Sequence, residues 1–204
     1  MDCRLLLQGI LLGFSIAAPV GPIGVLCIRR TLAEGHLSGL VSGLGAATAD
    51  AIYGTIAACG LVFVVTPLIR QQAWLGAIGG AFLCFLGIRT LVSEPVQSTV
   101  DERRRGLLAS YASALFLTLT NPMSILAFAA IIGSVGGAAS AGNQTSAALL
   151  VLGVFIGSAI WWLVLSSAVS LFRQRFTLRA LRWTNRLSGL LLLGFGLVSL
   201  VKLL

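Results

Sequence analysis

Long apolar stretches separated by short charged ones dominate this sequence of 204 residues. Hydrophobic residues make up 57% of the chain and charged residues only 10%, whereas a soluble domain carries about 25% charged residues. Too few polar side chains remain to cover a water-soluble particle. A hydrocarbon core requires about 20 apolar residues for each crossing helix. The sequence therefore predicts an all-α integral membrane protein.

Six segments are long and apolar enough to be transmembrane helices: residues 5–28, 37–65, 72–92, 107–133, 147–171 and 187–204. The N-terminus is similar to a signal peptide, but the apolar pattern resumes after Pro22, so we expect the first segment to remain as a span. The last segment is short. Residues 172–186 before it either lengthen it or form an amphipathic helix at the membrane interface, because arginines recur at helical spacing on one face.

The positive charges are distributed unevenly between the two sides of the membrane. Of the 14 Lys and Arg residues, 11 fall in the connections after the first, third and fifth spans, and Arg4, Arg70 and Lys202 fall on the other side. The positive-inside rule places the arginine-rich side in the cytoplasm, with both termini outside. We expect the net charge of +8 to meet anionic lipid at the cytoplasmic arginine clusters, not nucleic acid.

An internal repeat relates the two halves of the sequence. Without a gap, Trp74, Gly80, Gly87 and Leu91 match Trp183, Gly189, Gly196 and Leu200. Aligning Gly45 with Gly153 places Asp50 on Ser158 and Tyr53 on Trp161. Because each half contains three spans, the second half enters from the opposite side, as in many secondary transporters. We expect one transporter domain over 1–204, with inverted repeats at about 1–92 and 107–204 joined by a cytoplasmic loop, 93–106.

Asp50 is the only acid deep inside a predicted span. A charged residue at that depth costs about 2.5–3.5 kcal/mol on insertion scales, so it usually faces an interior cavity and has a function. Three roles are open for Asp50: a reversible proton carrier, a partner of a substrate ammonium group, or a packing contact with a neighbouring helix.

Proline breaks interrupt the first and fourth spans, at Pro19 and Pro22 around Gly21, and at Pro122 after Asn121. A helix that restarts after a break begins with free N–H groups and the positive end of its dipole, which can hold a carboxylate. Asn121 is placed to cap such a half-helix or to contact a ligand. The alternative is a simple proline kink satisfied by neighbouring helices.

Ser158, Tyr53 and Trp161 are further candidates because they lie at or one turn beyond the repeat positions of Asp50. Tyr53 and Trp161 either wall a cavity or have a lipid-facing or packing role, and for Ser158 the alternative is a hydrogen bond to its own helix backbone. The four cysteines form no CxxC pair, and the chain has one histidine and two methionines, so we expect neither a metal site nor a cofactor. The sequence contains no hydrolase triad and no Walker loop, and we expect no enzyme activity.

The stretches "PVGPIGVLCIRRTLAEG", "GLVSGLGAATADAIYG" and "TNPMSILAF" resemble the LysE/RhtB family of bacterial amino-acid exporters over nearly the whole chain. The family motifs fall on Pro19, Gly21, Pro22, Asp50, Asn121 and Pro122. Two departures lie beside them: Met123 stands where relatives often have Lys, and Ala49 where they have Gly.

The resemblance implies secondary efflux of an amino acid or a small derivative across the bacterial cytoplasmic membrane, driven by the proton-motive force. Together with the repeat it implies alternating access around a midplane site. The sequence is also compatible with a homodimer. The alternatives are export of another small solute or a metal ion, and a passive channel.

Overall fold

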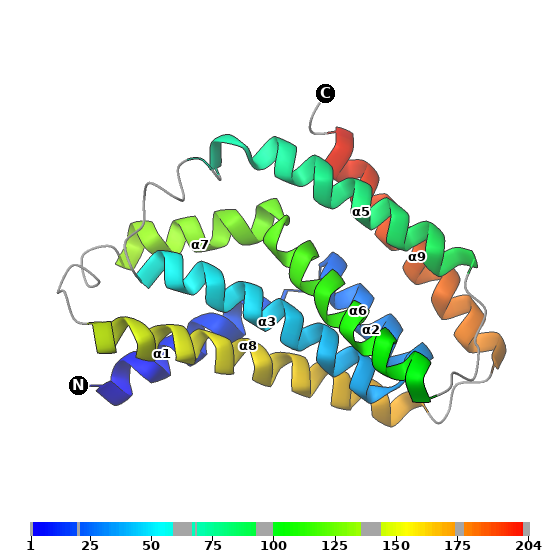
Figure 1. The fold of residues 1–204 in the computed structure, drawn as a ribbon, viewed down its shortest axis with the longest axis horizontal. Coiled ribbons are helices and arrows are strands. Elements are labelled where there is room, and N and C mark those ends of the chain that lie inside the picture. The colour runs from blue at the N-terminus through cyan, green and yellow to red at the C-terminus, as the bar shows by residue number, and fades with distance from the viewer. Residues whose placement is uncertain are drawn as a thin grey trace.

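The computed structural model describes residues 2–19, 21–58, 67, 69–92, 100–135, 144–173 and 178–201, which form helices and no strands. Figure 1 shows their arrangement. In chain order the helices are α1 (Asp2–Ala17), α2 (Pro22–Glu34), α3 (His36–Ala58), α5 (Gln72–Val92), α6 (Val100–Leu119), α7 (Pro122–Val135), α8 (Gln144–Arg173) and α9 (Leu178–Val201).

Four of the described helices are each long and apolar enough to cross a membrane: α3, α5, α8 and α9. Two further helix pairs pass the same test together, α1 with α2 and α6 with α7, and they are bent by 82° and 62° at their breaks. The described part of the chain thus holds four candidate spans, or up to six if each bent pair is one span. The predicted all-helical membrane protein is confirmed at this level, as a multi-pass chain.

Large apolar side chains cover the outer faces of the helices. On α9, Leu190, Leu191 and Leu197 are each more than half exposed, and on α5 so are Phe85 and Ile88. Such a continuous apolar exterior is unfavourable in water, and it is the surface that a lipid bilayer requires.

The described helix bounds add detail to the sequence prediction at two places. Residues 100–106, the end of the expected cytoplasmic connection 93–106, form the start of α6, which begins at Val100; residues 93–99 lie outside the described part. Of the two alternatives for 172–186, residues 178–186 follow the one in which this segment lengthens the last span, because α9 begins at Leu178, and α8 extends to Arg173; residues 174–177 lie outside the described part.

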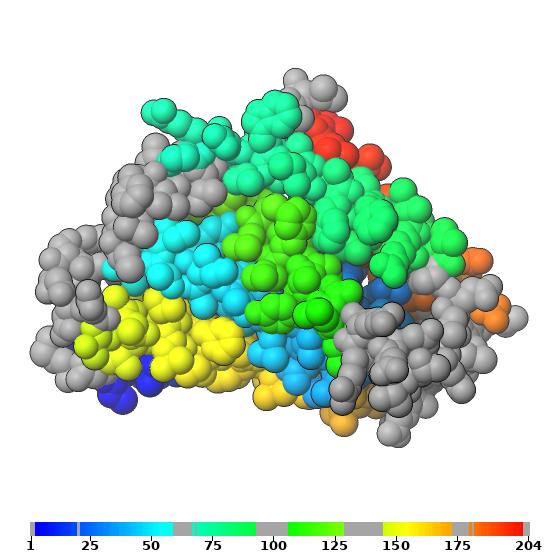
Figure 2. Space-filling model, in the orientation of Figure 1, coloured from blue at the N-terminus to red at the C-terminus, as the bar shows by residue number. Residues whose placement is uncertain are grey.

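The helices pack in three groups. Helices α5 and α9 lie side by side along the upper edge in Figure 1, and α1 packs against α8 at the lower edge. Helix α3 lies between α8 and α6, and α2 packs behind it against α3, α8 and α9. Figure 2 shows α3 at the surface between α8 and the α6–α7 pair. The buried core where these groups meet includes Leu26, Ala47, Leu117, Trp162 and Leu192.

Glycines set the close approach of α5 and α9. A Cβ atom at Gly80 would lie 2.9 Å from the carbonyl oxygen of Gly196, and one at Gly87 would lie 2.9 Å from that of Gly189. These are the four glycines that the repeat alignment matches. Small residues allow membrane helices to approach backbone to backbone, which strengthens dispersion contacts between them.

We expect Gly196→Leu to destabilise the protein, because the new side chain would meet Cys84 Sγ at 2.6 Å and the Gly80 carbonyl at 2.7 Å. Overpacking of this kind costs about 1–3 kcal/mol. Thermal unfolding of the purified protein in detergent measures the effect. Gly194→Leu is the matched control on the same helix, since nothing lies within 4 Å of a Cβ there. Equal melting temperatures for the two variants would contradict this account of the α5–α9 contact.

Candidate functional site

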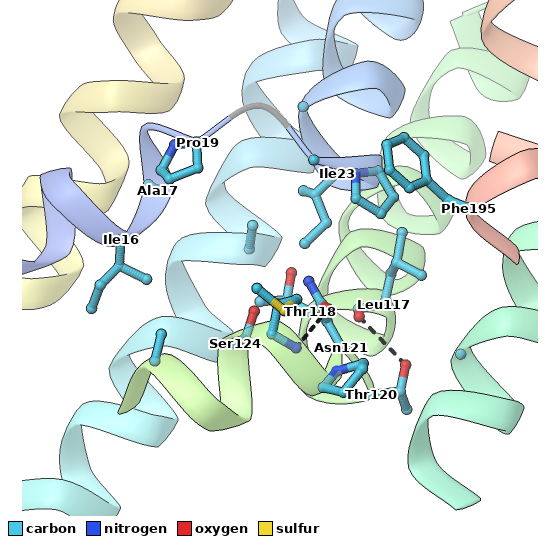
Figure 3. Close-up of a pocket in the computed structure, with 18 of the residues that line it drawn as sticks. Ile16, Ala17, Pro19, Ile23, Leu117, Thr118, Thr120, Asn121, Ser124 and Phe195 are labelled. Atoms are coloured by element: carbon cyan, nitrogen blue, oxygen red, sulfur yellow. Dashed lines mark hydrogen bonds between the residues drawn. The ribbon is translucent and has the colours of Figure 1, made fainter. Parts of the chain in front are cut away.

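A cavity of about 640 Å³ lies between the two helix breaks (Figure 3). Pro19 and Ile23 approach it from the α1–α2 break, and Thr118, Asn121 and Ser124 approach it from the α6–α7 break. Helices α3, α5, α8 and α9 complete its wall. The fold therefore brings both predicted proline breaks to one cavity, although they are a hundred residues apart in the chain.

The first break leaves the start of α2 without a side-chain cap. Gly21 is the N-cap residue and has extended backbone angles, and it makes no side-chain hydrogen bond to the first turn. Pro22 occupies the first helical turn, where its missing N–H leaves nothing unsatisfied. Gly21, Pro22, Ile23 and Gly24 all line the cavity. The N–H groups of this turn and the positive end of the helix dipole are thus directed to a space that can hold an anion.

The second break is capped by its own asparagine. The Met123 N–H donates to Asn121 Oδ1 at 3.1 Å, and the Ile125 N–H donates to the Asn121 carbonyl at 3.2 Å. The Asn121 Oδ1 atom accepts a hydrogen bond from the backbone. The other group of this side-chain amide is Nδ2, which is a hydrogen-bond donor on a residue that lines the cavity. The two half-helices therefore differ: α2 begins without a side-chain cap, and α7 begins with the Asn121 cap.

Asp50 lies on α3, is 4% exposed and lines the same cavity. Its Oδ2 accepts a hydrogen bond of 2.7 Å from Ser158 Oγ on α8. The two residues that the repeat alignment superposes are therefore in direct contact. Asp50 is the only ionisable residue among the described residues of the cavity wall. The remaining polar side-chain groups there are the Asn121 amide, the Trp162 indole N–H and the hydroxyls of Ser15, Thr118, Thr120, Ser124 and Ser199.

Tyr53 and Trp161 do not line this cavity. The Tyr53 hydroxyl donates to the Leu119 carbonyl at 2.6 Å, and its ring stacks on Phe128 with centroids 5.4 Å apart. Trp161 packs edge-on against Phe14 of α1 at 5.3 Å. Of the two roles open for these residues, the contacts in the structure are packing contacts, each made with one of the broken helices.

Part of the cavity wall was not among the residues singled out from the sequence. Trp162 lines it instead of its neighbour Trp161, and α5 and α9 contribute Gly76, Gly79, Phe195 and Ser199. The α5 glycines make room for the second break, because a Cβ at Gly79 would lie 2.7 Å from Thr120 Oγ1. Ser199 Oγ donates to the Gly76 carbonyl at 2.7 Å and joins the two helices at this end. In the sequence, the glycine repeat was the signal that could have indicated this part of the cavity wall.

Comparison with known proteins places the chain in a family. The family model described as "LysE type translocator" matches residues 14–203. A Bacillus subtilis protein named, provisionally, for amino acid efflux is 33% identical over 197 residues, which cover 95% of this chain and 93% of the relative. An arginine exporter of Enterobacter sp. is 25% identical over 91% of this chain and 88% of the relative.

A third relative, a chemotactic transduction protein of Pseudomonas aeruginosa, is 25% identical over 95% of this chain and 96% of its own length. No solved structure gives a significant match. The predicted resemblance is thus confirmed by a model that spans nearly the whole sequence. The chain belongs to the LysE type translocator family.

Proposed function

We propose that this protein is a secondary active exporter of an amino acid with an uncharged side chain, working across the bacterial inner membrane. The observation that carries the proposal is the composition of one cavity, where the two broken helices meet and where Asp50 is the one ionisable residue among the described wall residues. The amino acid efflux and arginine export named for two relatives support an amino acid as the substrate, and the uncharged side chain is inferred from the cavity alone. The arginine-rich connections lie on the cytoplasmic side in this proposal, and both termini lie outside.

The substrate carboxylate is held at the start of α2. This turn lacks a side-chain cap, and Ile23 and Gly24 line the cavity, so their N–H groups and the helix dipole provide an uncompensated positive end. The Asn121 side-chain amide at the opposite break is a second donor to this carboxylate, at either of its two oxygens. Half-helix N-termini that hold substrate carboxylates are a recurrent device of transporters with discontinuous helices.

The substrate ammonium pairs with Asp50. The Ser158 hydroxyl bond fixes the orientation of this carboxyl group, and an ionised carboxylate has further lone pairs for an ammonium donor. A second charge on the substrate would find no counter-charge among the described wall residues, and burying an unpaired charge is very costly. Leu83, Leu117, Phe195 and Val198 offer an apolar surface to the side chain instead. These properties favour a zwitterion with a neutral side chain over arginine, lysine or glutamate.

Inverted repeats supply the two states of the transport cycle. Exchanging the halves turns the Gly80–Gly196 contact into the Gly189–Gly87 contact, and both contacts are present. The same exchange maps the Asp50–Ser158 pair onto itself, so the proposed pseudo-two-fold axis passes near this bond. Rocking of the halves about that axis gives alternating access. A proton carried by Asp50 when substrate is absent would couple export to the proton-motive force.

We expect Asp50→Asn to lower amino acid efflux from dipeptide-loaded cells by at least about tenfold, since a charge-assisted hydrogen bond is worth ~1.5–3 kcal/mol. Thr55→Val on the same helix is the matched control, because the Thr55 hydroxyl bonds only the Ala51 carbonyl of its own helix in the structure. Efflux is measured as the appearance of the amino acid in the medium, at equal amounts of membrane-inserted protein. Undiminished export by Asp50→Asn would remove Asp50 from the mechanism.

Selectivity is tested with the purified protein in liposomes loaded with a labelled neutral amino acid. External neutral amino acids should accelerate counterflow, and arginine, lysine and glutamate should leave it unchanged, because their second charge is unpaired in the cavity. Acceleration by arginine as strong as that by neutral amino acids would contradict the proposed substrate class. Export from cells that continues at the same rate with an uncoupler would instead favour a passive channel.

A further inference from the structure

The cavity lies toward one end of the helix bundle. Its α5 wall is Gly76, Gly79, Gly80 and Leu83, whereas Arg89 stands at the opposite end of that helix. Its α9 wall is Phe195, Val198 and Ser199, whereas Arg182 and Arg186 stand near the other end. Helix α2 runs from the cavity, at Pro22–Gly24, to Arg29 and Arg30. This helix therefore leads from the proposed binding site toward the arginine-rich end of the molecule.

Arg30 is buried there, with an exposed fraction of 6%. Its Nη1 donates to Ser42 Oγ of α3 and to the Ser110 carbonyl of α6, each at 2.9 Å, and its Nη2 donates to Ser113 Oγ of α6 at 2.8 Å. All three acceptors are uncharged. The guanidinium is thus desolvated, and its hydrogen bonds go to two other helices. These bonds are lost when α2 moves away from α3 and α6, and the buried charge is then left without partners.

Arg29 makes the corresponding connection on the other side of α2. Its Nε donates to Asn185 Oδ1 of α9 at 3.3 Å, and its Nη1 lies 3.3 Å from Glu34 Oε1. Glu34 Oε2 in turn accepts a 2.6 Å bond from the Ser38 hydroxyl of α3. The two consecutive arginines therefore join the end of α2 to α3, α6 and α9 at once.

Tightly packed side chains fill α2 between the cavity and these arginines. Leu26 and Cys27 are at most 1% exposed, and neither of them lines the cavity. We infer that Arg29 and Arg30, with the packed turn before them, form a gate that closes the proposed transport path at its cytoplasmic end. The assignment of this closure to a transport path rests on the proposed function.

The gate has no polar counterpart in the second half of the sequence. Aligning Pro22 with Pro122 places Ala129 and Ala130 at the positions of Arg29 and Arg30. The cytoplasmic closure is therefore held by charged hydrogen bonds, and the equivalent closure of the other state has none at these positions. Opening toward the cytoplasm requires that the Arg30 bonds to Ser42, Ser110 and Ser113 break together.

Cys27 is a built-in reporter of this gate, because it lies between the cavity and the arginines and is 1% exposed. In a variant with Cys3, Cys59 and Cys84 replaced by serine, we would measure labelling of Cys27 by a membrane-impermeant maleimide in inside-out vesicles. Arg30→Gln should accelerate labelling by at least about tenfold, because we expect it to raise the population of the open state by the same factor. Arg186→Gln, an exposed arginine on the neighbouring helix, should leave the rate unchanged.

A second variant covers the case in which Arg30→Gln does not insert. Ser42→Ala combined with Ser113→Ala keeps the arginine but removes two of its acceptors, so Cys27 labelling should also accelerate. Ser166→Ala is the matched control, because this buried hydroxyl bonds carbonyls of its own helix. Unchanged labelling in the folded serine variant would overturn the gate.

The labelling assay uses no substrate, so the gate and the exporter can fail separately. Accelerated labelling in a protein that exports no amino acid would refute the proposed function and keep the closure. Normal export by the wild-type protein, together with unchanged labelling in the gate variants, would refute the gate and keep the function.

Discussion

A helix that breaks inside a membrane exposes backbone N–H and C=O groups, and lipid offers them no hydrogen bond. Such a break is tolerated only where protein or a polar cavity surrounds it. This constraint organises the molecule, because the breaks before Pro22 and Pro122 both face one cavity. The other helices must then enclose that space. Tyr53 contributes directly, since its hydroxyl donates to the carbonyl of Leu119, the last residue of α6 before the second break.

The enclosing helices combine close contacts with open space. Glycines on α5 and α9 bring these helices together, and the same residues leave room at the cavity, as at Gly79 beside Thr120. Gly9 and Gly153 play a similar part between α1 and α8, where a Cβ at Gly9 would lie 2.9 Å from the Gly153 Cα. Polar contacts between the described helices include the Asp50–Ser158 bond near the cavity and the Arg30 bonds near the end of α2.

The features that could be predicted from sequence are those set by local chemistry. Apolar length predicted the helices, and α5 occupies the predicted range of 72–92. Proline predicted the two breaks, and the lone buried acid Asp50 drew notice because any charge is costly at that depth. Local pattern was insufficient where a helix continues through polar residues. It therefore did not predict that α6 begins at Val100, and it left open whether the residues before the last span belong to α9, which begins at Leu178.

Side-chain partners were also beyond sequence reasoning, because they depend on how distant helices meet. A rotation of about 100° separates neighbouring residues on a helix, so Trp162 lines the cavity and Trp161 packs on Phe14. Arg30 was recognisable as a marker of topology. Its burial among Ser42, Ser110 and Ser113 appears only when α2, α3 and α6 are assembled.

The central claim is that the space between the two broken helices binds the exported amino acid. The most direct measurement is substrate protection of a single cysteine at Ser124, which lines the cavity at the second break, in a variant without the native cysteines. Labelling of Ser124→Cys by a small impermeant thiol reagent is followed in intact cells and in inside-out vesicles. The account predicts that the exported amino acid slows this labelling at concentrations that also saturate export. Labelling that is unaffected by an amino acid that the same variant still exports would contradict it.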